Sequence, residues 1–214
     1  MMTRLLLVRH GQSMANLDDI FAGHLDVELS PLGHEQAERT AEFIAENYKV
    51  DKVYASDLKR AYKTAEHIAA KFGLEVIPVK QMREISAGEW DGETFDALWE
   101  KYPEEFGMWK NDIGNAGCTG GETTKEMACR IASALEKIAQ ENEGKTVVVA
   151  THATPIRVTQ CAWQGISFDG MKDIDWVSNA SVTEGVYENG VFKMVKSGQD
   201  AHLAELKTEL PANV

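Results

Sequence analysis

Short, wholly apolar runs alternate along the chain with segments in which apolar residues recur every three or four positions. Apolar runs bounded by polar residues are typical of buried strands, whereas spacings of three and four are typical of helices with one buried face. This alternation predicts an α/β fold, a three-layer α/β/α sandwich with a mainly parallel central sheet. The predicted strands are Leu5–Val8, Val53–Ala55, Leu74–Val79 and Thr146–Ala150, followed by a hairpin of Val182–Tyr187 and Val191–Val195 with an Asn-Gly turn.

Capping signals predict where the first two helices begin and end. Ser30 followed by proline indicates a helix start, with the serine oxygen as the N-cap, and this helix is expected over Pro31–Tyr48. Ser56 or Asp57 is expected to cap a second helix. Gly73 is expected to end it, because glycine readily adopts the left-handed conformation found at helix C-termini.

The second half of the chain has a long irregular stretch followed by two more helices. Residues 81–121 are rich in Gly, Trp and acidic residues, and only Phe95–Lys101 has a helical pattern, so the stretch is predicted to form a small cap or lid. The sequence TTKE at 123–126 makes a capping box, and the helix that it starts is expected to end near Gly144. A last helix is expected to begin around Pro155.

Length, charge and cysteine content narrow the class of protein. The 214 residues, without a low-complexity linker, predict a single domain over 1–214 with the cap inserted at about 81–121. Lys and Arg number 22 and Asp and Glu number 34, so the net charge of −12 argues against nucleic-acid or membrane-surface partners. No apolar run is long enough for a signal peptide or a membrane span. Cys118, Cys129 and Cys161 lack CxxC spacing, which indicates neither a disulfide framework nor a zinc site and favours a cytoplasmic protein.

Two of the predicted strands, far apart in the sequence, lead directly into histidines. His10 follows the first strand and His152 follows the strand at 146–150. Because the carboxyl ends of parallel strands meet at one edge of a sheet, the two imidazoles are expected to share a site. Arg9 offers a planar fork suited to phosphate, and Gly11 allows a close backbone approach. The same loop adds neutral hydrogen-bonding groups at Ser13 and Asn16.

These residues belong to a longer series of motifs. The sequence RHGQSMAN at 9–16 resembles the RHG signature of the histidine phosphatase superfamily, the phosphoglycerate mutase-like proteins. The segments that follow also resemble that family, in its order, and they run through nearly the whole chain. They read GHLDVELSPLGHEQA, SDLKRAYKTA, REISAGEWDG, GGET and THATPIR.

The resemblance implies a role for each residue of the catalytic group. His10 would attack phosphorus through one ring nitrogen while a backbone carbonyl holds the other, which forms a covalent phosphohistidine. Arg9, Arg60 and His152 would surround the transferred phosphoryl group and neutralise its equatorial oxygens without a metal. Glu84 would protonate the leaving oxygen and then activate water. No metal or other cofactor is implied.

The resemblance also implies residues that bind the substrate. Asn16 would add a neutral donor to the phosphoryl group, and the backbone NH of Thr154 would face the phosphate from the start of a helix. Ala153 stands where the family commonly has glycine, so an added methyl group narrows the backbone approach. The implied substrate-binding residues are Ser13, Asn16, Gly23, Ala153 and Thr154.

Residues without a catalytic role in these motifs are interpreted as structural or as part of the entrance. Aromatic residues suggest an apolar entrance to the pocket, and four further histidines fit no ligand spacing and are interpreted as structural or exposed. The aromatic residues are Phe21, Trp90, Trp99 and Trp109, and the histidines are His24, His34, His67 and His202.

The sequence favours a metal-independent phosphomonoesterase that hydrolyses a small phosphorylated metabolite. The runner-up is a cofactor-dependent phosphoglycerate mutase. This sequence resembles the mutases less well, because Ile85 stands where they carry arginine. The 36 positions from Glu84 to Gly120 are also fewer than the mutase insertion. A catalytically silent domain that binds a phosphorylated ligand is a third hypothesis. A metal-dependent hydrolase is disfavoured because the sequence has no compact set of His and carboxylate ligands. Sugar phosphates, nucleotide-like phosphates and phosphoserine all remain open as substrates, as does the oligomeric state.

Overall fold

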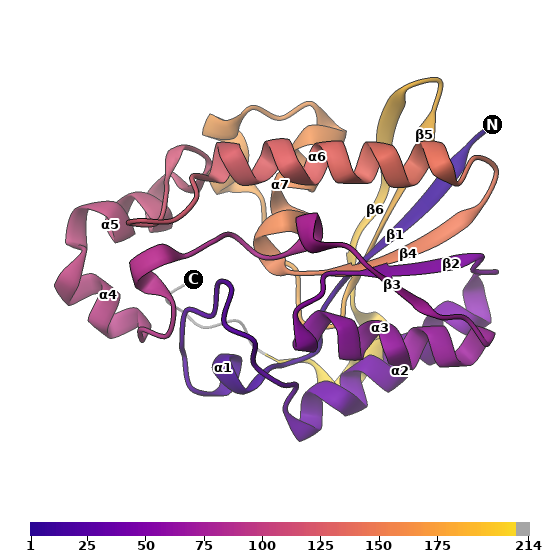
Figure 1. The fold of residues 1–214 in the computed structure, drawn as a ribbon, viewed down its shortest axis with the longest axis horizontal. Helices are drawn as coiled ribbons and strands as arrows, with labels where there is room; N and C mark the ends of the chain where they lie inside the picture. The colour runs from indigo at the N-terminus through magenta and orange to yellow at the C-terminus, as the bar shows by residue number, and fades with distance from the viewer. Residues whose placement is uncertain (209–214) are drawn as a thin grey trace.

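A computed structural model describes residues 1–208 and contains a mixed six-stranded sheet at its centre (Figure 1). The strand order is β3-β2-β4-β1-β5-β6. The pairs β3/β2, β2/β4 and β4/β1 are parallel, whereas β1/β5 and β5/β6 are antiparallel. Every predicted strand is present. Their bounds are Thr3–Arg9 (β1), Lys52–Ala55 (β2), Val76–Pro78 (β3), Thr146–Thr151 (β4), Val182–Glu188 (β5) and Val191–Gln199 (β6).

Helices cover both faces of the sheet, which confirms the predicted three-layer α/β/α architecture (Figure 1). The four covering helices are Pro31–Asn47 (α2), Lys59–Phe72 (α3), Thr124–Glu141 (α6) and Ala153–Gln164 (α7). The sequence of β1 is apolar without alternation because both faces of the strand are buried. Leu5 and Leu7 pack in the core beneath α6 and α7, whereas Leu6 and Val8 pack in the core beneath α2 and α3.

Two of the predicted helix starts are confirmed and one is wrong. Ser30 caps α2 by accepting from Gly33 N, and the capping box at 123–126 forms in both directions. Helix α3 instead has Leu58 at its N-cap and no side-chain cap, because both expected residues have other partners. The Ser56 hydroxyl lies 2.9 Å from His152 Nε2, and the Asp57 carboxylate pairs with Arg83.

Helix ends differ from the sequence expectations by up to three residues. Helix α6 ends at Glu141 rather than near Gly144, and α7 begins at Ala153 rather than at Pro155. Besides two 3-10 turns between β3 and Phe95, four short elements among the described residues lie outside the predicted set. They are the helix Met14–Leu17 (α1) and the 3-10 turns Ile113–Asn115 (η3), Phe168–Asp173 (η4) and Ala201–Leu206 (η5).

The segment 81–121 is more helical than its sequence predicts. Helix Phe95–Lys101 (α4) is confirmed, but Pro103–Asn111 forms a second helix, α5, that the sequence reading missed. Two acidic residues and a glycine interrupt its apolar pattern, so that only Phe106 and Trp109 mark its buried face. Helices α4 and α5 form a lobe beside the sheet (Figure 1). The 3-10 turns Lys80–Met82 (η1) and Gly88–Trp90 (η2) precede this lobe.

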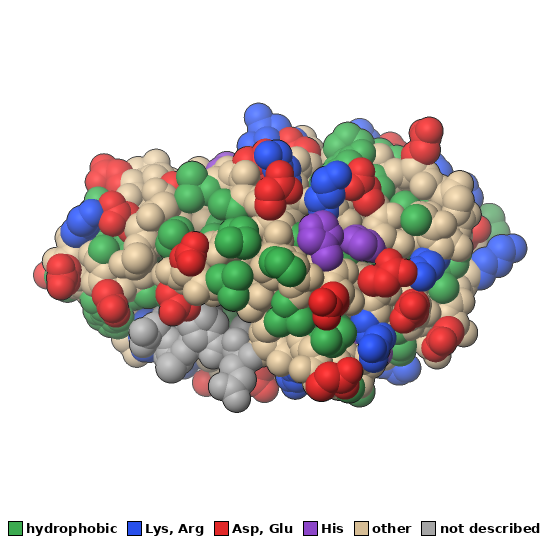
Figure 2. Space-filling view, turned by 90° about the horizontal axis from the view of Figure 1, so that it is seen from below, with side chains coloured by type: hydrophobic (Ala, Val, Ile, Leu, Met, Phe, Trp, Pro, Cys, Tyr) green, Lys and Arg blue, Asp and Glu red, His purple; other side chains and the backbone are tan. Residues whose placement is uncertain are grey.

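The surface carries many charged side chains, and one pair of histidines is prominent on the face seen from below in Figure 2. His34 on α2 lies 3.1 Å from His67 on α3, which in turn contacts Glu38. The three cysteines are free thiols. Among residues 1–208, no helix is long and apolar enough to cross a membrane.

Candidate active site

The register of β1 against β4 brings the two predicted histidines together. Arg9 pairs with Thr151 across the parallel strands, so His10 and His152 follow at equivalent positions. His10 N donates to the Thr151 carbonyl over 3.0 Å. The two imidazole centroids lie 5.2 Å apart, one ring edge facing the other. The sequence expectation that the strand ends meet at one site is met.

Hydrogen bonding selects one tautomer of His10. Its Nδ1 lies 2.7 Å from the Gly11 carbonyl, which can only accept, so Nδ1 carries the proton and donates. Nε2 then holds a lone pair and has no hydrogen-bond partner among the described residues. Burial lowers the pKa of His10 well below its ordinary value, and the charges of Arg60 and Arg9 lower it further. His10 is therefore a neutral imidazole with a free nucleophilic nitrogen.

His152 lies behind His10 rather than at the surface of the pocket. It is fully buried, and its Nε2 lies 2.9 Å from Ser56 Oγ. Its Nδ1 has no partner among the described residues. Burial first, then the charge of Arg60, lowers its pKa well below the ordinary value, so this imidazole is also neutral.

Two buried guanidinium groups face the pocket. Backbone carbonyls orient Arg60, which donates to Gly23 over 2.8 Å and to Leu25 over 2.7 Å. Arg9 donates to the Val177 carbonyl over 2.6 Å, and its Nε has no partner within the described chain. Burial lowers the pKa of each arginine to about 10, so both stay charged at neutral pH. The pair forms a fixed positive site whose geometry suits an anion.

Neutral groups complete this end of the pocket. The Asn16 amide oxygen accepts from the backbone NH and the hydroxyl of Ser13, and from Asn179 Nδ2. This orientation leaves the Asn16 amide nitrogen as a donor for a ligand. Gly23 lines the pocket with a φ of +39°, and an added Cβ would lie 2.1 Å from an Asp91 oxygen, so only glycine fits there.

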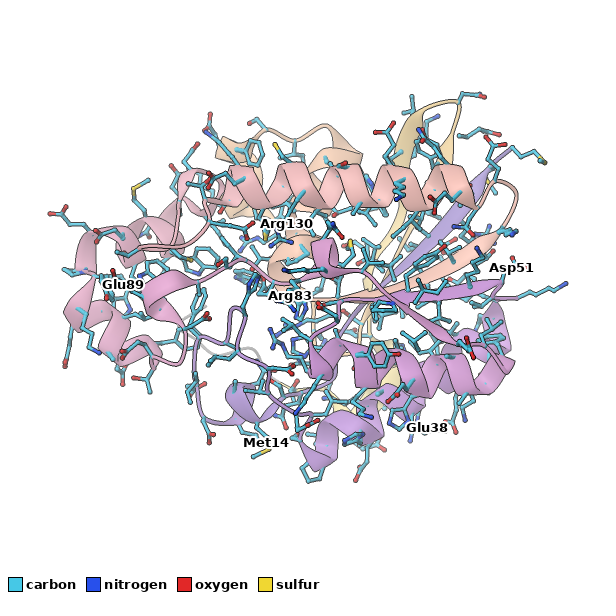
Figure 3. The ribbon with its side chains drawn as sticks, viewed as in Figure 1. Met14, Glu38, Asp51, Arg83, Glu89 and Arg130 are labelled. Atoms are coloured by element: carbon cyan, nitrogen blue, oxygen red, sulfur yellow. The ribbon has the colours of Figure 1, made fainter. Side chains whose placement is uncertain are left out.

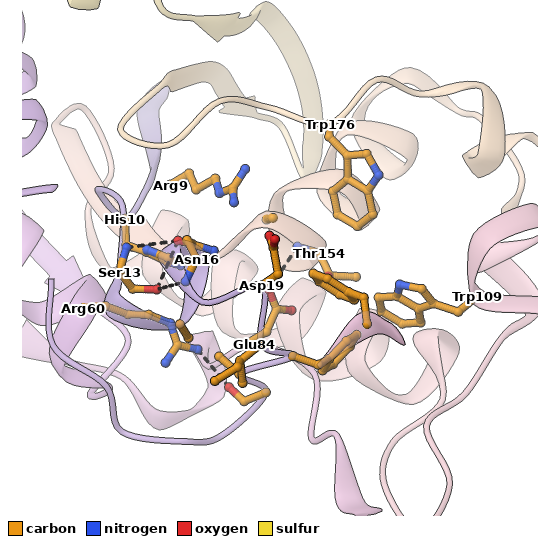
Figure 4. Close-up of a pocket in the computed structure, with 17 residues that line it drawn as sticks. Arg9, His10, Ser13, Asn16, Asp19, Arg60, Glu84, Trp109, Thr154 and Trp176 are labelled. Atoms are coloured by element: carbon orange, nitrogen blue, oxygen red, sulfur yellow. Dashed lines mark hydrogen bonds between the residues drawn. The ribbon is translucent and has the colours of Figure 1, made fainter. Parts of the chain in front are cut away.

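Glu84 approaches the same pocket from the segment after β3 (Figure 4). One carboxylate oxygen accepts from Ile85 N over 2.8 Å and the other from Thr154 N over 3.3 Å. The Thr154 NH, which the sequence predicts to face phosphate, donates to Glu84 instead. Ala153 is the first residue of α7 and lines the pocket, so the helix start accommodates its methyl group.

A guanidinium from α6 fixes the backbone that carries Glu84 (Figure 3). Arg130 donates to the carbonyls of Gln81, Arg83 and Glu84 over 2.6 to 2.8 Å. It also pairs with both carboxylate oxygens of Glu122, one of which accepts from Ser86 N. His24, expected to be structural, adds a 2.9 Å contact to the Glu84 carbonyl.

Nine of the ten predicted site residues line one pocket, and His152 lies directly behind it. Gly11 has a different role from the one expected. Its missing Cβ would lie 2.2 Å from the Gly33 carbonyl, so glycine allows close contact with α2 rather than with phosphate. Among the described residues, no group of three or more His, Cys, Asp or Glu side chains could hold a metal ion.

The predicted aromatic entrance is only half correct. Phe21 and Trp109 line the pocket, whereas Trp90 is fully buried and Trp99 packs edge-on against Phe106. The sequence assigns no role to six other lining residues, because five of them lie in segments without a motif and the sixth, Ala15, offers no polar group within its motif. They are Ala15, Asp19, Ile20, Ala22, Phe95 and Trp176.

Comparison with known proteins agrees with this geometry. The sequence profile of the histidine phosphatase superfamily (branch 1) matches residues 5–200. The chain belongs to this superfamily. The RHG resemblance is thereby confirmed, and a phosphoric monoester hydrolase is the enzyme class that the family and its named members support.

Several members of the superfamily align along most of the chain. Phosphoserine phosphatase 1 of Hydrogenobacter thermophilus is 33% identical over 97% of this chain and 98% of its own. A metal-independent phosphoserine phosphatase of Arabidopsis thaliana is also 33% identical, over 82% of this chain and 79% of its own. A mutant of Entamoeba histolytica phosphoserine phosphatase, solved in complex with phosphoserine, superposes with a TM-score of 0.83 at 27% identity, covering 94% of this chain and 99% of that one.

Proposed function

We propose that this protein hydrolyses small phosphomonoesters through a phosphohistidine on His10, without a metal. The observation that carries this proposal is the free Nε2 of a neutral His10 beside two charged guanidiniums. Nε2 attacks phosphorus, the bond from phosphorus to the ester oxygen breaks, and protonated Glu84 gives its proton to the leaving alcohol. Water then gives a proton to Glu84 and attacks phosphorus, the P–N bond breaks, and inorganic phosphate leaves.

The charge on the transferred group is balanced by fixed groups of the chain. Arg9 and Arg60 carry the positive charge, and the Asn16 amide adds a neutral donor. Because backbone carbonyls already orient both guanidiniums, little reorganisation is needed when the phosphoryl group moves. This arrangement supplies electrostatic stabilisation that a metal ion provides in other phosphatases.

Hydrolysis is favoured over the mutase reaction by the surroundings of Glu84. Ile85, at the position where mutases carry arginine, is fully buried and does not line the pocket. No lysine lines the pocket within the described chain, and both lining arginines serve the phosphoryl group. A phosphoglycerate carboxylate therefore finds no partner that would hold it for the return of the phosphoryl group. The relatives named above, which act on phosphoserine, support a small phosphorylated metabolite as substrate.

The test is a substitution of the nucleophile with a chemical readout. His10→Ala should reduce hydrolysis of p-nitrophenyl phosphate to below about one per cent, because loss of a nucleophile costs several powers of ten. His34→Ala, which removes an exposed histidine, is the matched control. Rapid quench of the wild type with ³²P-labelled ester should give an acid-labile, base-stable label that His10→Ala lacks.

Two results would contradict the proposal. One is substantial turnover by His10→Ala without any covalent label in the wild type. The other is loss of activity on treatment with EDTA that a divalent ion restores. Conversion of 3-phosphoglycerate to 2-phosphoglycerate, faster than phosphate release from any monoester, would favour the mutase instead.

A further inference from the structure

The pocket continues beyond the phosphoryl site into a region lined mainly by rings and aliphatic side chains (Figure 4). Under the proposed function, the part of the substrate that leaves as the alcohol lies in this outer region. We call it the outer pocket, and it consists of Asp19, Ile20, Phe21, Ala22, Phe95, Trp109 and Trp176.

Within the described chain, Asp19 is the only charged residue of the outer pocket. Its carboxylate forms no ion pair and no hydrogen bond with any described side chain or backbone group. The other acidic group of the pocket, Glu84, accepts from two backbone NH groups. Asp19 thus presents a negative charge that the described protein does not neutralise.

The backbone holds Asp19 at this place. Its φ is +50°, in the left-handed region that Asp and Asn tolerate better than other non-glycine residues. Its carbonyl accepts from Phe95 N over 3.2 Å, and Ile20 forms a β-bridge with Thr94. These bonds tie the loop after α1 to the start of α4, so Asp19 and Phe95 lie on the same wall of the pocket.

Among the described residues, the outer pocket has no lysine or arginine that could pair with a substrate carboxylate. The Phe21 and Trp109 rings pack edge to face at 5.3 Å. Arg157 stacks on Trp176, with its guanidinium carbon 4.2 Å from the ring centroid, but Arg157 is buried and does not line the pocket. Its charge is covered by the ring. A leaving group with a negative charge would therefore meet Asp19 and apolar surface.

We propose that the preferred substrates are phosphomonoesters whose leaving group carries a positive charge, namely small amino-alcohol phosphates with an ammonium or quaternary ammonium group. The cation lies in the outer pocket against Asp19 and the Trp109 ring, where a carboxylate and an aromatic face both attract it. This inference rests on the proposed hydrolase function, since it assigns the leaving-group side of the same pocket.

The experiment compares two esters of almost identical shape. Phosphocholine and 3,3-dimethylbutyl phosphate differ by a charged nitrogen in place of a carbon. Because Asp19 is exposed to solvent, wild-type kcat/KM is expected to be about fivefold higher for phosphocholine, as an exposed cation contact of this kind provides. In Asp19→Asn, which keeps a residue that tolerates the backbone conformation, this ratio should fall to about one.

Controls separate this proposal from the hydrolase function on which it rests. Asp18→Asn changes a neighbouring exposed carboxylate that does not line the pocket, and it should leave the ratio unchanged. Hydrolysis of p-nitrophenyl phosphate by Asp18→Asn should also stay near the wild-type rate. A far-UV circular dichroism spectrum and a urea midpoint equal to those of the wild type show that Asp19→Asn is folded.

The results that overturn the proposal are specific. A wild-type ratio near one, or a ratio that Asp19→Asn does not change, would exclude a cation subsite while leaving the hydrolase intact. Faster hydrolysis of phosphoserine than of phosphoethanolamine would show that a carboxylate is recognised, which also overturns it. Failure of the wild type to hydrolyse any monoester would instead overturn the hydrolase function itself.

Discussion

His10 and His152 are buried as neutral imidazoles, and this gives a pH dependence to stability. The pKa of each is lowered in the folded state, chiefly by burial and then by the charge of Arg60. The unfolded chain takes up these protons near pH 6.5, whereas the folded chain does not. The free energy of unfolding should therefore fall as pH drops below about 6.5 and level off below the folded pKa values.

The measurement is urea unfolding at pH 7.5, 6.5 and 5.5. Each histidine contributes a slope of up to about 1.4 kcal/mol per pH unit. His152→Asn should flatten the dependence, and His34→Asn, which changes an exposed histidine, should not. A wild-type stability that is constant from pH 7.5 to 5.5 would show that the two imidazoles become protonated in the folded state.

Single residues were predictable from the sequence where they belong to a motif. His10, Arg60 and Glu84 each stand in a distinctive string, and all three line one pocket. Asp19 and Trp176 stand in segments without such a string, so only the folding of distant segments onto one wall assigns them to the site. Chemistry that is tied to a local sequence pattern can be read from sequence, but substrate contacts made by scattered residues cannot.

At the scale of elements, α6 controls the position of the candidate acid through Arg130. Arg130→Lys should lower kcat about tenfold for an alkyl phosphate, because one ammonium group cannot bind three carbonyls and Glu122 together. The loss should be smaller for p-nitrophenyl phosphate, whose leaving group needs no proton, and KM should change little.

Steady-state kinetics on the two esters would measure this effect, with Arg39→Lys, which changes a partly exposed arginine outside the pocket, as the control. Equal losses of kcat on both esters would mean that Arg130 supports the fold of the 81–121 segment rather than the position of Glu84. A rise in KM with unchanged kcat would place Arg130 in substrate binding instead.

The elements that were misjudged from the sequence show how tertiary contacts override local signals. Ser56 and Asp57 are good N-cap residues, yet His152 and Arg83 engage their side chains, and α3 begins without a side-chain cap. Helix α5 lacks a clear apolar stripe because it buries only two rings, Phe106 and Trp109. Both rings pack against Trp90.

At the scale of the whole molecule, the net charge of −12 opposes the approach of anionic substrates. Raising NaCl from about 20 to about 200 mM should increase kcat/KM for the dianion of p-nitrophenyl phosphate, since salt screens this long-range repulsion. The increase should be smaller for phosphocholine, whose net charge is lower. Initial rates at low substrate concentration measure both, with KCl in place of NaCl as the control. A fall in kcat/KM with salt would show that Arg9 and Arg60 dominate the approach.

The contributions of the sheet and of the α4/α5 lobe to the pocket are separable. Arg9, His10 and His152 come from the ends of β1 and β4, and the α4/α5 lobe contributes only Phe95 and Trp109 to the described lining. A library that diversifies or exchanges residues 93–112 would therefore sample new substrate preferences while Arg9, His10 and His152 stay unchanged. In directed evolution, the residues of the lobe are therefore the ones to vary, and the residues at the ends of β1 and β4 are the ones to keep.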